Sequence, residues 1–260
     1  MNRSPLKYFL LVFALAIPLW LFGGRPLLGP SNFPLTLSVL IQPFVPLIAA
    51  SILVYREEGG GRGVRRLLSR VFDQRRIRKK TWHLPIIFLM PLIYLLTYGL
   101  MALTGLTLSG APVAFLATPI LFVAFFVLAI GEEAGWTGYA TDPLQERWSA
   151  LTTSIILGLV WATWHFVPLI QMSRTPTWIA WWTLGTVALR ILIVWLYNNT
   201  GKSLFAAIVF HAMINLSLSI FQIDYDQAIV WFTIGAFTAI AAMIVTFLWG
   251  SRTLARYRYA

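Results

Sequence analysis

Carboxylates, imidazoles and one carboxamide are embedded in long apolar stretches of this 260-residue chain. They are Glu132, Glu133, His165, His211 and Asn215, and Arg190 adds a lone guanidinium. A carboxylate can act as general base on a water molecule, and imidazole or carboxamide donors can stabilise a developing oxyanion. Because charged groups are rare and costly in apolar segments that cross a membrane, we expect these residues to converge on one buried site.

The two glutamates are adjacent and therefore cannot both point directly into one cavity. Neighbouring residues of a helix point about 100° apart. We expect one of Glu132 and Glu133 to act on the chemistry while a donor holds the other. The alternative is a helix end at which both carboxylates reach the lipid headgroups.

The histidines lie in two further apolar stretches. His165 shares a helical face with Trp161, four residues earlier, and by itself is typical of a satisfied core histidine. His211 and Asn215 are also four residues apart, so imidazole and carboxamide can present two donors to one point. A polar contact between helices is the alternative for this pair.

Two kinds of hydrolytic chemistry fit these residues. A carboxylate can activate water without a metal, or Glu132, His165 and His211 can hold a divalent ion such as zinc and leave one position for water. The chain has no cysteine. Thiol catalysis, disulfides, cysteine-ligated zinc and cysteine-ligated iron–sulfur clusters are therefore excluded.

The composition indicates that these apolar segments lie in a membrane. Apolar residues make up 58% of the chain and charged residues 11%, against about 25% charged in soluble domains. Runs of about 17–25 apolar residues can cross a bilayer as helices. We predict an all-α membrane protein with one polytopic domain over residues 1–260 and a retained first helix. Eight spans are expected: Leu6–Phe22, Leu35–Val54, Leu84–Leu103, Pro112–Ile130, Leu151–Ile170, Trp178–Tyr197, Leu204–Ile220 and Ala228–Leu248.

The basic residues predict the orientation. With both termini in the cytoplasm, seventeen of the 20 lysines and arginines lie inside and only Arg25 and Arg174 lie outside. This asymmetry accounts for the net charge of +11 without a nucleic-acid partner. The localisation that follows is integral to a bacterial or archaeal cell membrane.

A basic segment, residues 55–82, precedes the third span. The glycines of Gly59–Gly63 predict a flexible hinge, and Val64, Leu67, Leu68, Val71 and Phe72 then recur at helical spacing between arginines. We expect a basic amphipathic helix on the membrane surface, held against anionic lipids. A docking surface for an acidic substrate is the alternative.

The order of these motifs resembles the CPBP group of intramembrane proteases, which includes CAAX prenyl endopeptidases and bacterial relatives linked to bacteriocin immunity. Glu132-Glu133 matches the start of the group's Glu-Glu-x-x-x-Arg motif, Trp161 to His165 matches Phe-x-x-x-His, and His211 to Asn215 matches His-x-x-x-Asn. Thr137 stands at the motif arginine and Trp161 at the phenylalanine. We hypothesise that Arg190 or Arg147 supplies the missing positive charge.

The resemblance implies an endopeptidase acting on membrane-embedded or lipidated substrates. In it Glu132 is the base on water, His165 positions that water, His211 and Asn215 stabilise the oxyanion and Glu133 orients the site. The metal version, with Glu132, His165 and His211 as ligands, stays open. One depth conflict follows from the spans: Glu132 ends the fourth, whereas His165 lies roughly 21 Å into the fifth. They meet if the fourth helix continues past Tyr139.

Other classes of function remain. The chain lacks the His-Glu-x-x-His zinc motif and the serine and paired-aspartate motifs of other intramembrane proteases. A non-catalytic membrane immunity or interaction protein with the protease fold is favoured by Thr137. A proton-coupled transporter would use the same glutamates and histidines, although no internal repeat supports it.

Overall fold

The fold is helical throughout the part of the chain that the structure describes. This computed structural model describes residues 3–23, 40–105, 115–221 and 223–255, in which no strand occurs. The long helices are α1 (Pro5–Phe22), α5 (His83–Leu103), α6 (Thr118–Gly135), α8 (Ala150–Gln171), α9 (Pro176–Asn199), α10 (Leu204–Ile220) and α11 (Ala228–Trp249). The shorter helices are α3 (Val45–Glu57), α4 (Gly61–Ser69) and α7 (Asp142–Gln145).

The predicted membrane architecture is confirmed in part. Six helical segments of the described residues are long and apolar enough to cross a membrane. Helix α10 is apolar but has only 17 residues, and α3 has 13. The predicted span Leu35–Val54 and the first residues of Pro112–Ile130 fall partly outside the described residues. The protein is therefore an integral membrane protein, and the count of eight spans is not confirmed.

Hydroxyl side chains set the start of several long helices. Ser149, Thr175 and Ser203 precede α8, α9 and α10, and each accepts a hydrogen bond from a backbone N–H of the first turn. Such caps satisfy donors that the helix itself leaves unpaired. These caps allow short connections between neighbouring helices of a membrane protein, in which unpaired backbone groups are costly.

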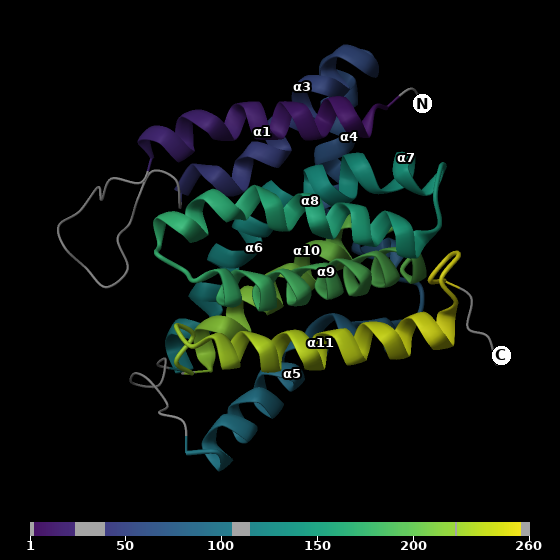
Figure 1. The fold of residues 1–260 in the computed structure, drawn as a ribbon. Helices are drawn as coiled ribbons and strands as arrows, with labels where there is room; N and C mark the ends of the chain where they lie inside the picture. The colour runs from purple at the N-terminus through teal and green to yellow at the C-terminus, as the bar shows by residue number, and fades with distance from the viewer. Residues whose placement is uncertain (1–2, 24–39, 106–114, 222, 256–260) are drawn as a thin grey trace.

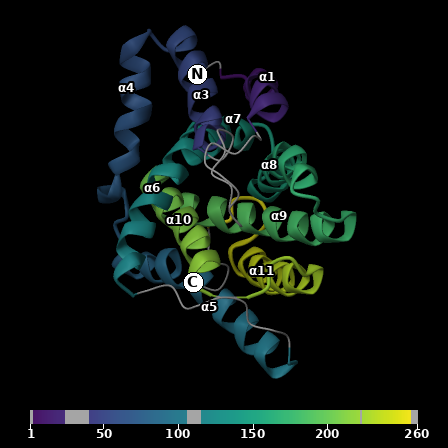
Figure 2. The ribbon, with the colours of Figure 1, turned by 90° about the vertical axis from the view of Figure 1, so that its left-hand side faces the viewer.

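Two sets of helices meet around the centre of the molecule. Helix α9 packs between α8 and α11, and α10 packs between α6 and α5. Figure 1 shows α1, α8, α9 and α11 running in nearly the same direction, with α6 and α10 behind them. In Figure 2, α5 projects from the lower edge of this bundle beside α11. The start of α1 and the end of α11 lie on the same side of the molecule (Figure 1).

Glycines allow close approach where α6 meets the N-terminal helices. A Cβ atom on Gly135 would lie 2.2 Å from the Tyr8 hydroxyl oxygen and 2.5 Å from the Pro46 carbonyl oxygen. A Cβ atom on Gly131 would lie 2.5 Å from the Pro43 carbonyl oxygen. Small residues permit such packing between helices in membranes. These two glycines lie on either side of the glutamate pair and hold it against α1 and α3.

Helix α4 runs across the direction of the spanning helices rather than along it (Figures 1 and 2). Within the Gly59–Gly63 segment only Gly59 and Gly60 have positive φ, at 82° and 70°, and the helix begins at Gly61. The predicted hinge over Gly59–Gly63 is therefore wrong in its second half, because Gly61 and Gly63 are helical. Leu67 is buried in the bundle, whereas Leu68 and Phe72 are exposed.

Candidate active site

A continuous helical segment brings the glutamates to the depth of the histidines. Helix α6 passes into a π-helical stretch, Trp136–Thr141, and then into α7, so that residues 118–145 form one 28-residue segment. The predicted end of this span at Ile130 is wrong. Glu132 and Glu133 lie near the middle of the segment, and Glu132 lines the same cavity as His165 of α8, so the depth conflict disappears.

The π-helical stretch is fixed by polar groups from distant parts of the chain. Arg3 and Arg70 donate to the Gly138 carbonyl oxygen at 2.9 Å and 3.2 Å, and Thr141 donates to the Trp136 carbonyl oxygen at 3.0 Å. Single π-helical turns occur frequently at functional sites. The irregular backbone here follows the glutamate pair directly and is stabilised from both the N-terminal segment and the basic segment.

Glu133 is fully buried and enclosed by donors. Arg190 donates to both of its carboxylate oxygens, at 2.9 Å and 3.1 Å. His211 Nδ1 lies 2.9 Å from the same carboxylate, and the Thr137 hydroxyl also donates to it. Because a buried carboxylate needs a paired charge and filled hydrogen bonds, this arrangement keeps Glu133 ionised in a structural and orienting position.

Arg190 occupies the place that the sequence left open for a positive charge. Its side chain has no exposed surface, lies 3.4 Å from the Thr137 hydroxyl and stacks over the Trp161 ring at 4.5 Å. Arg147, the other candidate, is exposed. A guanidinium on α9 thus reaches Glu133 beside Thr137, the residue of the π-helical stretch that stands at the position of the motif arginine.

Glu132 has a different environment from its neighbour. One of its carboxylate oxygens accepts a hydrogen bond of 2.6 Å from the Trp161 indole N–H. Its side chain borders a cavity of about 120 Å³, which is large enough to hold water. Of the two carboxylates, Glu132 is therefore the one that faces space in which a water can react.

Both histidines direct one ring nitrogen away from the cavity. His165 Nδ1 lies 2.9 Å from the Trp161 carbonyl oxygen, and because a carbonyl only accepts, Nδ1 carries the hydrogen. His211 Nδ1 faces the Glu133 carboxylate in the same way. Each neutral ring then has an unprotonated Nε2. The hydrogen bond that Nδ1 makes fixes both the tautomer and the orientation of the ring.

The same cavity collects four of the five predicted site residues. It is lined by Glu132, His165, His211 and Asn215. Aromatic side chains from four helices complete its wall: Tyr94, Trp161, Trp182 and Trp231. Glu133, the fifth residue, does not line the cavity but contacts the ring of His211, which does. The sequence predicts Trp161 beside the site but carries no signal for Tyr94, Trp182 and Trp231.

The metal ligand set has no support in this geometry. Within the described residues, no three or more histidine, aspartate or glutamate side chains are grouped closely enough to hold an ion. Glu132, His165 and His211 border one cavity without forming such a group, and one Glu132 oxygen is engaged by Trp161. We therefore derive no chemical step through a metal.

The fold and site define a polytopic helical membrane protein with a buried glutamate and histidine centre, which is the class of intramembrane hydrolases. The family model for type II CAAX prenyl endopeptidases, Rce1-like, matches residues 114–217, which contain every residue of that centre. The chain is also 30% identical over 262 residues to CAAX prenyl protease 2 of Methanococcus maripaludis, covering 94% of each chain.

The chain therefore belongs to the Rce1-like CAAX prenyl endopeptidase family. Membership makes it an intramembrane endopeptidase with a membrane-associated peptide substrate. The comparisons give no support for a bacteriocin immunity function or a metalloprotease type.

Proposed function

We propose that the protein hydrolyses peptide bonds of prenylated, CAAX-like substrates, with Glu132 as the general base. The observation that carries this proposal is the asymmetry of the glutamate pair. Glu133 is enclosed by Arg190, His211 and Thr137, whereas Glu132 borders the cavity with one engaged oxygen. The name of the Methanococcus maripaludis relative and the description of the family suggest the prenylated substrate.

The proposed reaction begins with a water molecule between Glu132 and His165. Glu132 accepts a proton from this water, whose oxygen attacks the scissile carbonyl carbon, and the unprotonated Nε2 of His165 accepts the water's other hydrogen bond and orients it. The carbonyl oxygen becomes an oxyanion as the C–O bond forms. The C–N bond then breaks, and the proton held by Glu132 moves to the leaving amine.

In this proposal His211 and Asn215 stabilise the oxyanion. The Asn215 carboxamide has two N–H donors, and His211 Nε2 donates when its ring is protonated. Glu133 accepts from the other ring nitrogen and stabilises that positive ring. Donors placed before the reaction at the position of developing charge are worth about 2.7–4 kcal/mol of barrier each.

The surroundings of the site belong to the same proposal. We assign both termini and the basic segment 55–82 to the cytoplasm, where its unpaired cations meet anionic lipids. A divalent metal is a separate proposal, for which Glu132, His165 and His211 would have to lie closer together than the structure places them. Loss of cleavage with a strong chelator would support it.

A non-catalytic interaction protein with the protease fold is the second candidate. Thr137 in place of the motif arginine favours it. Against it stands Arg190, whose two hydrogen bonds to Glu133 restore the charge that Thr137 removes. The geometry that a water-activating site needs is thus retained.

Peptide cleavage by the purified protein distinguishes these two candidates. We would incubate it in detergent with farnesylated and unmodified versions of one CAAX peptide and identify products by mass spectrometry. Glu132→Gln should abolish cleavage, and Glu146→Gln, at an exposed position, should leave it unchanged. Cleavage that survives Glu132→Gln would contradict the base assignment. Absence of cleavage by the correctly folded wild type would favour the interaction protein.

A further inference from the structure

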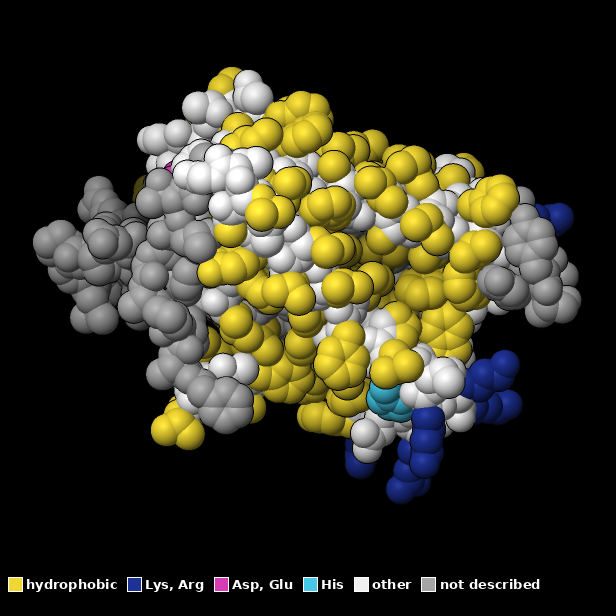
Figure 3. Space-filling model, turned by 90° about the horizontal axis from the view of Figure 1, so that it is seen from below, with side chains coloured by type: hydrophobic (Ala, Val, Ile, Leu, Met, Phe, Trp, Pro, Cys, Tyr) yellow, Lys and Arg dark blue, Asp and Glu magenta, His cyan; other side chains and the backbone are white. Residues whose placement is uncertain are grey.

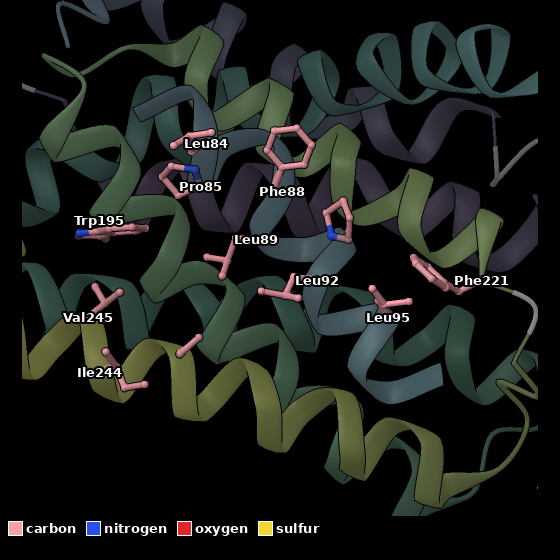
Figure 4. A pocket seen from close by; sticks show the side chains of 12 residues that line it. Leu84, Pro85, Phe88, Leu89, Leu92, Leu95, Trp195, Phe221, Ile244 and Val245 are labelled. Carbon is pink, nitrogen blue, oxygen red and sulfur yellow. The ribbon is translucent and has the colours of Figure 1, made fainter. Parts of the chain in front are cut away.

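A second cavity, larger than the one at the active site, lies elsewhere in the molecule. It is a groove of about 650 Å³ between α5 and α11. Figure 4 shows Leu84, Phe88 and Leu92 of α5 facing Ile244 and Val245 of α11 across it. Leu84, Phe88 and Leu92 are half exposed or more. Every residue that lines the groove is apolar, so the groove suits a hydrocarbon chain, which needs no hydrogen-bond partner.

The groove has the length of one leaflet. Its lining residues on α5 extend from Leu84 to Leu95, which corresponds to about 17 Å at the helical rise. Half of a hydrocarbon core about 30 Å thick is about 15 Å. The lined stretch of α5 is therefore about as long as one acyl chain of a single leaflet.

An aromatic cluster marks the interface at one end of the groove. The Trp82 ring packs against Trp195 at 5.1 Å and against Trp249 at 6.2 Å, and Trp195 also lines the groove. Tryptophan is enriched where a membrane meets water. Leu84, at the start of the groove, follows Trp82 by two residues. The groove therefore opens at the level of the lipid headgroups.

Unpaired positive charges lie beside this opening. Arg78, Lys79 and Lys80 are exposed, and none of them forms an ion pair with another residue that the structure describes. Figure 3 shows this face of the molecule as almost continuously hydrophobic, with Lys and Arg side chains gathered at one end. A lipid whose acyl chain lies in the groove thus places its headgroup next to these three positive side chains.

We propose that the groove between α5 and α11 is a binding site for one anionic phospholipid of the leaflet that faces the basic segment. One acyl chain lies along Leu84–Leu95, and the phosphate lies against Lys79 and Lys80. This site is separate from the catalytic cavity, because Tyr94 lines the cavity whereas its neighbour Leu95 lines the groove. The proposal does not depend on the proposed peptidase reaction.

Native mass spectrometry of the delipidated protein tests this site directly. The protein would be titrated with phosphatidylglycerol and with phosphatidylcholine of identical acyl chains, and the affinity of the first bound lipid measured. We expect phosphatidylglycerol to bind more tightly. Lys79→Gln with Lys80→Gln should lower its affinity by about fivefold for each lysine, because a lysine near an anionic surface contributes about 1 kcal/mol.

Matched variants separate this site from general attraction between the protein and anionic lipid. Arg62→Gln with Arg65→Gln removes the same charge from exposed positions on α4 and should leave the first lipid bound. Ala241→Phe fills the groove from α11 and should remove it, whereas Ala14→Phe, at an exposed alanine of α1, should not.

Three results would overturn the proposal. The first is equal affinity for the two lipids. The second is unchanged binding by both the Lys79/Lys80 variant and Ala241→Phe. The third is displacement of the lipid by a farnesylated peptide, which would make the groove a substrate site. The lysine variant alters only exposed side chains, so it remains informative even if Ala241→Phe fails to fold.

Discussion

Replacement of Arg190 by glutamine should strongly destabilise the protein. The change leaves Glu133 as a buried carboxylate without its paired charge and removes two charge-assisted hydrogen bonds, at 2.9 Å and 3.1 Å. Hydrogen bonds to charged groups are worth about 1.5–3 kcal/mol each. Their sum is consistent with the loss of about 3–5 kcal/mol of unfolding free energy that follows removal of one partner of a buried ion pair.

Unfolding in mixed micelles with increasing SDS measures this change in the free energy of unfolding. Lys202→Gln is the control, because Lys202 pairs with Asp142 and their side chains are 54% and 34% exposed. Exposed pairs contribute about 0–1 kcal/mol, so the control should unfold close to the wild type.

A double-mutant cycle tests the reason for the destabilisation. Arg190→Gln and Glu133→Gln together remove both charges, so the double variant should be less destabilised than the sum of the two single variants. We expect a coupling of at least about 2 kcal/mol, since residues in direct contact couple by about 0.5–3 kcal/mol. An Arg190→Gln protein within about 1 kcal/mol of wild type, or strictly additive changes, would refute the reasoning.

Three further predictions concern the frame of the site. Gly135→Ala should lower the thermal stability of the purified protein sharply, because its methyl group would lie 2.2 Å from a tyrosine hydroxyl oxygen of α1. The control is Gly99→Ala, whose methyl group would have no atom within 4 Å. Equal melting temperatures of the two variants would contradict this packing. Thr137→Arg should abolish cleavage, because it places a second guanidinium next to Arg190, which lies 3.4 Å from the Thr137 hydroxyl. The double variant Thr137→Arg with Arg190→Thr should recover part of the cleavage activity. If the double variant is no more active than Thr137→Arg alone, an arginine at position 137 cannot replace Arg190. Trp161→Phe removes the 2.6 Å indole donor of Glu132 and should cost about 1–3 kcal/mol of unfolding free energy in the SDS assay, while cleavage stays within tenfold of wild type; an unchanged free energy would exclude this hydrogen bond.

The sequence predicts which residues lie together at the site better than it predicts their depth. The spacing of His211 and Asn215 places both on one helical face, and the structure confirms that both line the cavity with Glu132 and His165. Hydropathy ends the fourth span at Ile130 because polar and small residues follow. It cannot show that a π-helical stretch carries the helix on to Gln145.

The partner of Glu133 illustrates the same limit. A lone arginine inside an apolar helix predicts a buried acidic partner, and the hypothesis that Arg190 replaces the motif arginine agrees with its contacts. The choice between Arg190 and Arg147 depends on burial, which periodicity does not provide. The double role of Trp161, which donates to Glu132 and accepts from His165 through its carbonyl, requires atomic positions.

Two structural details lie beyond any local pattern. Gly61 and Gly63 read as part of a flexible hinge because glycine disfavours helices, yet they form the first turn of α4. The groove between α5 and α11 joins residues more than 140 positions apart. Such contacts between distant segments follow from helix packing and are absent from the hydropathy of either helix.

A single-turnover reaction in water labelled with oxygen-18 is the most direct test of the central claim that Glu132 activates a water for direct attack on the peptide bond. Excess enzyme would cleave a farnesylated CAAX peptide once, and mass spectrometry would then locate the label. We predict one labelled oxygen in the new carboxylate of the product, none in the Glu132 side chain, and no turnover by Glu132→Gln. Label in the Glu132 carboxylate would instead show that this residue attacks the substrate itself, which would contradict the account.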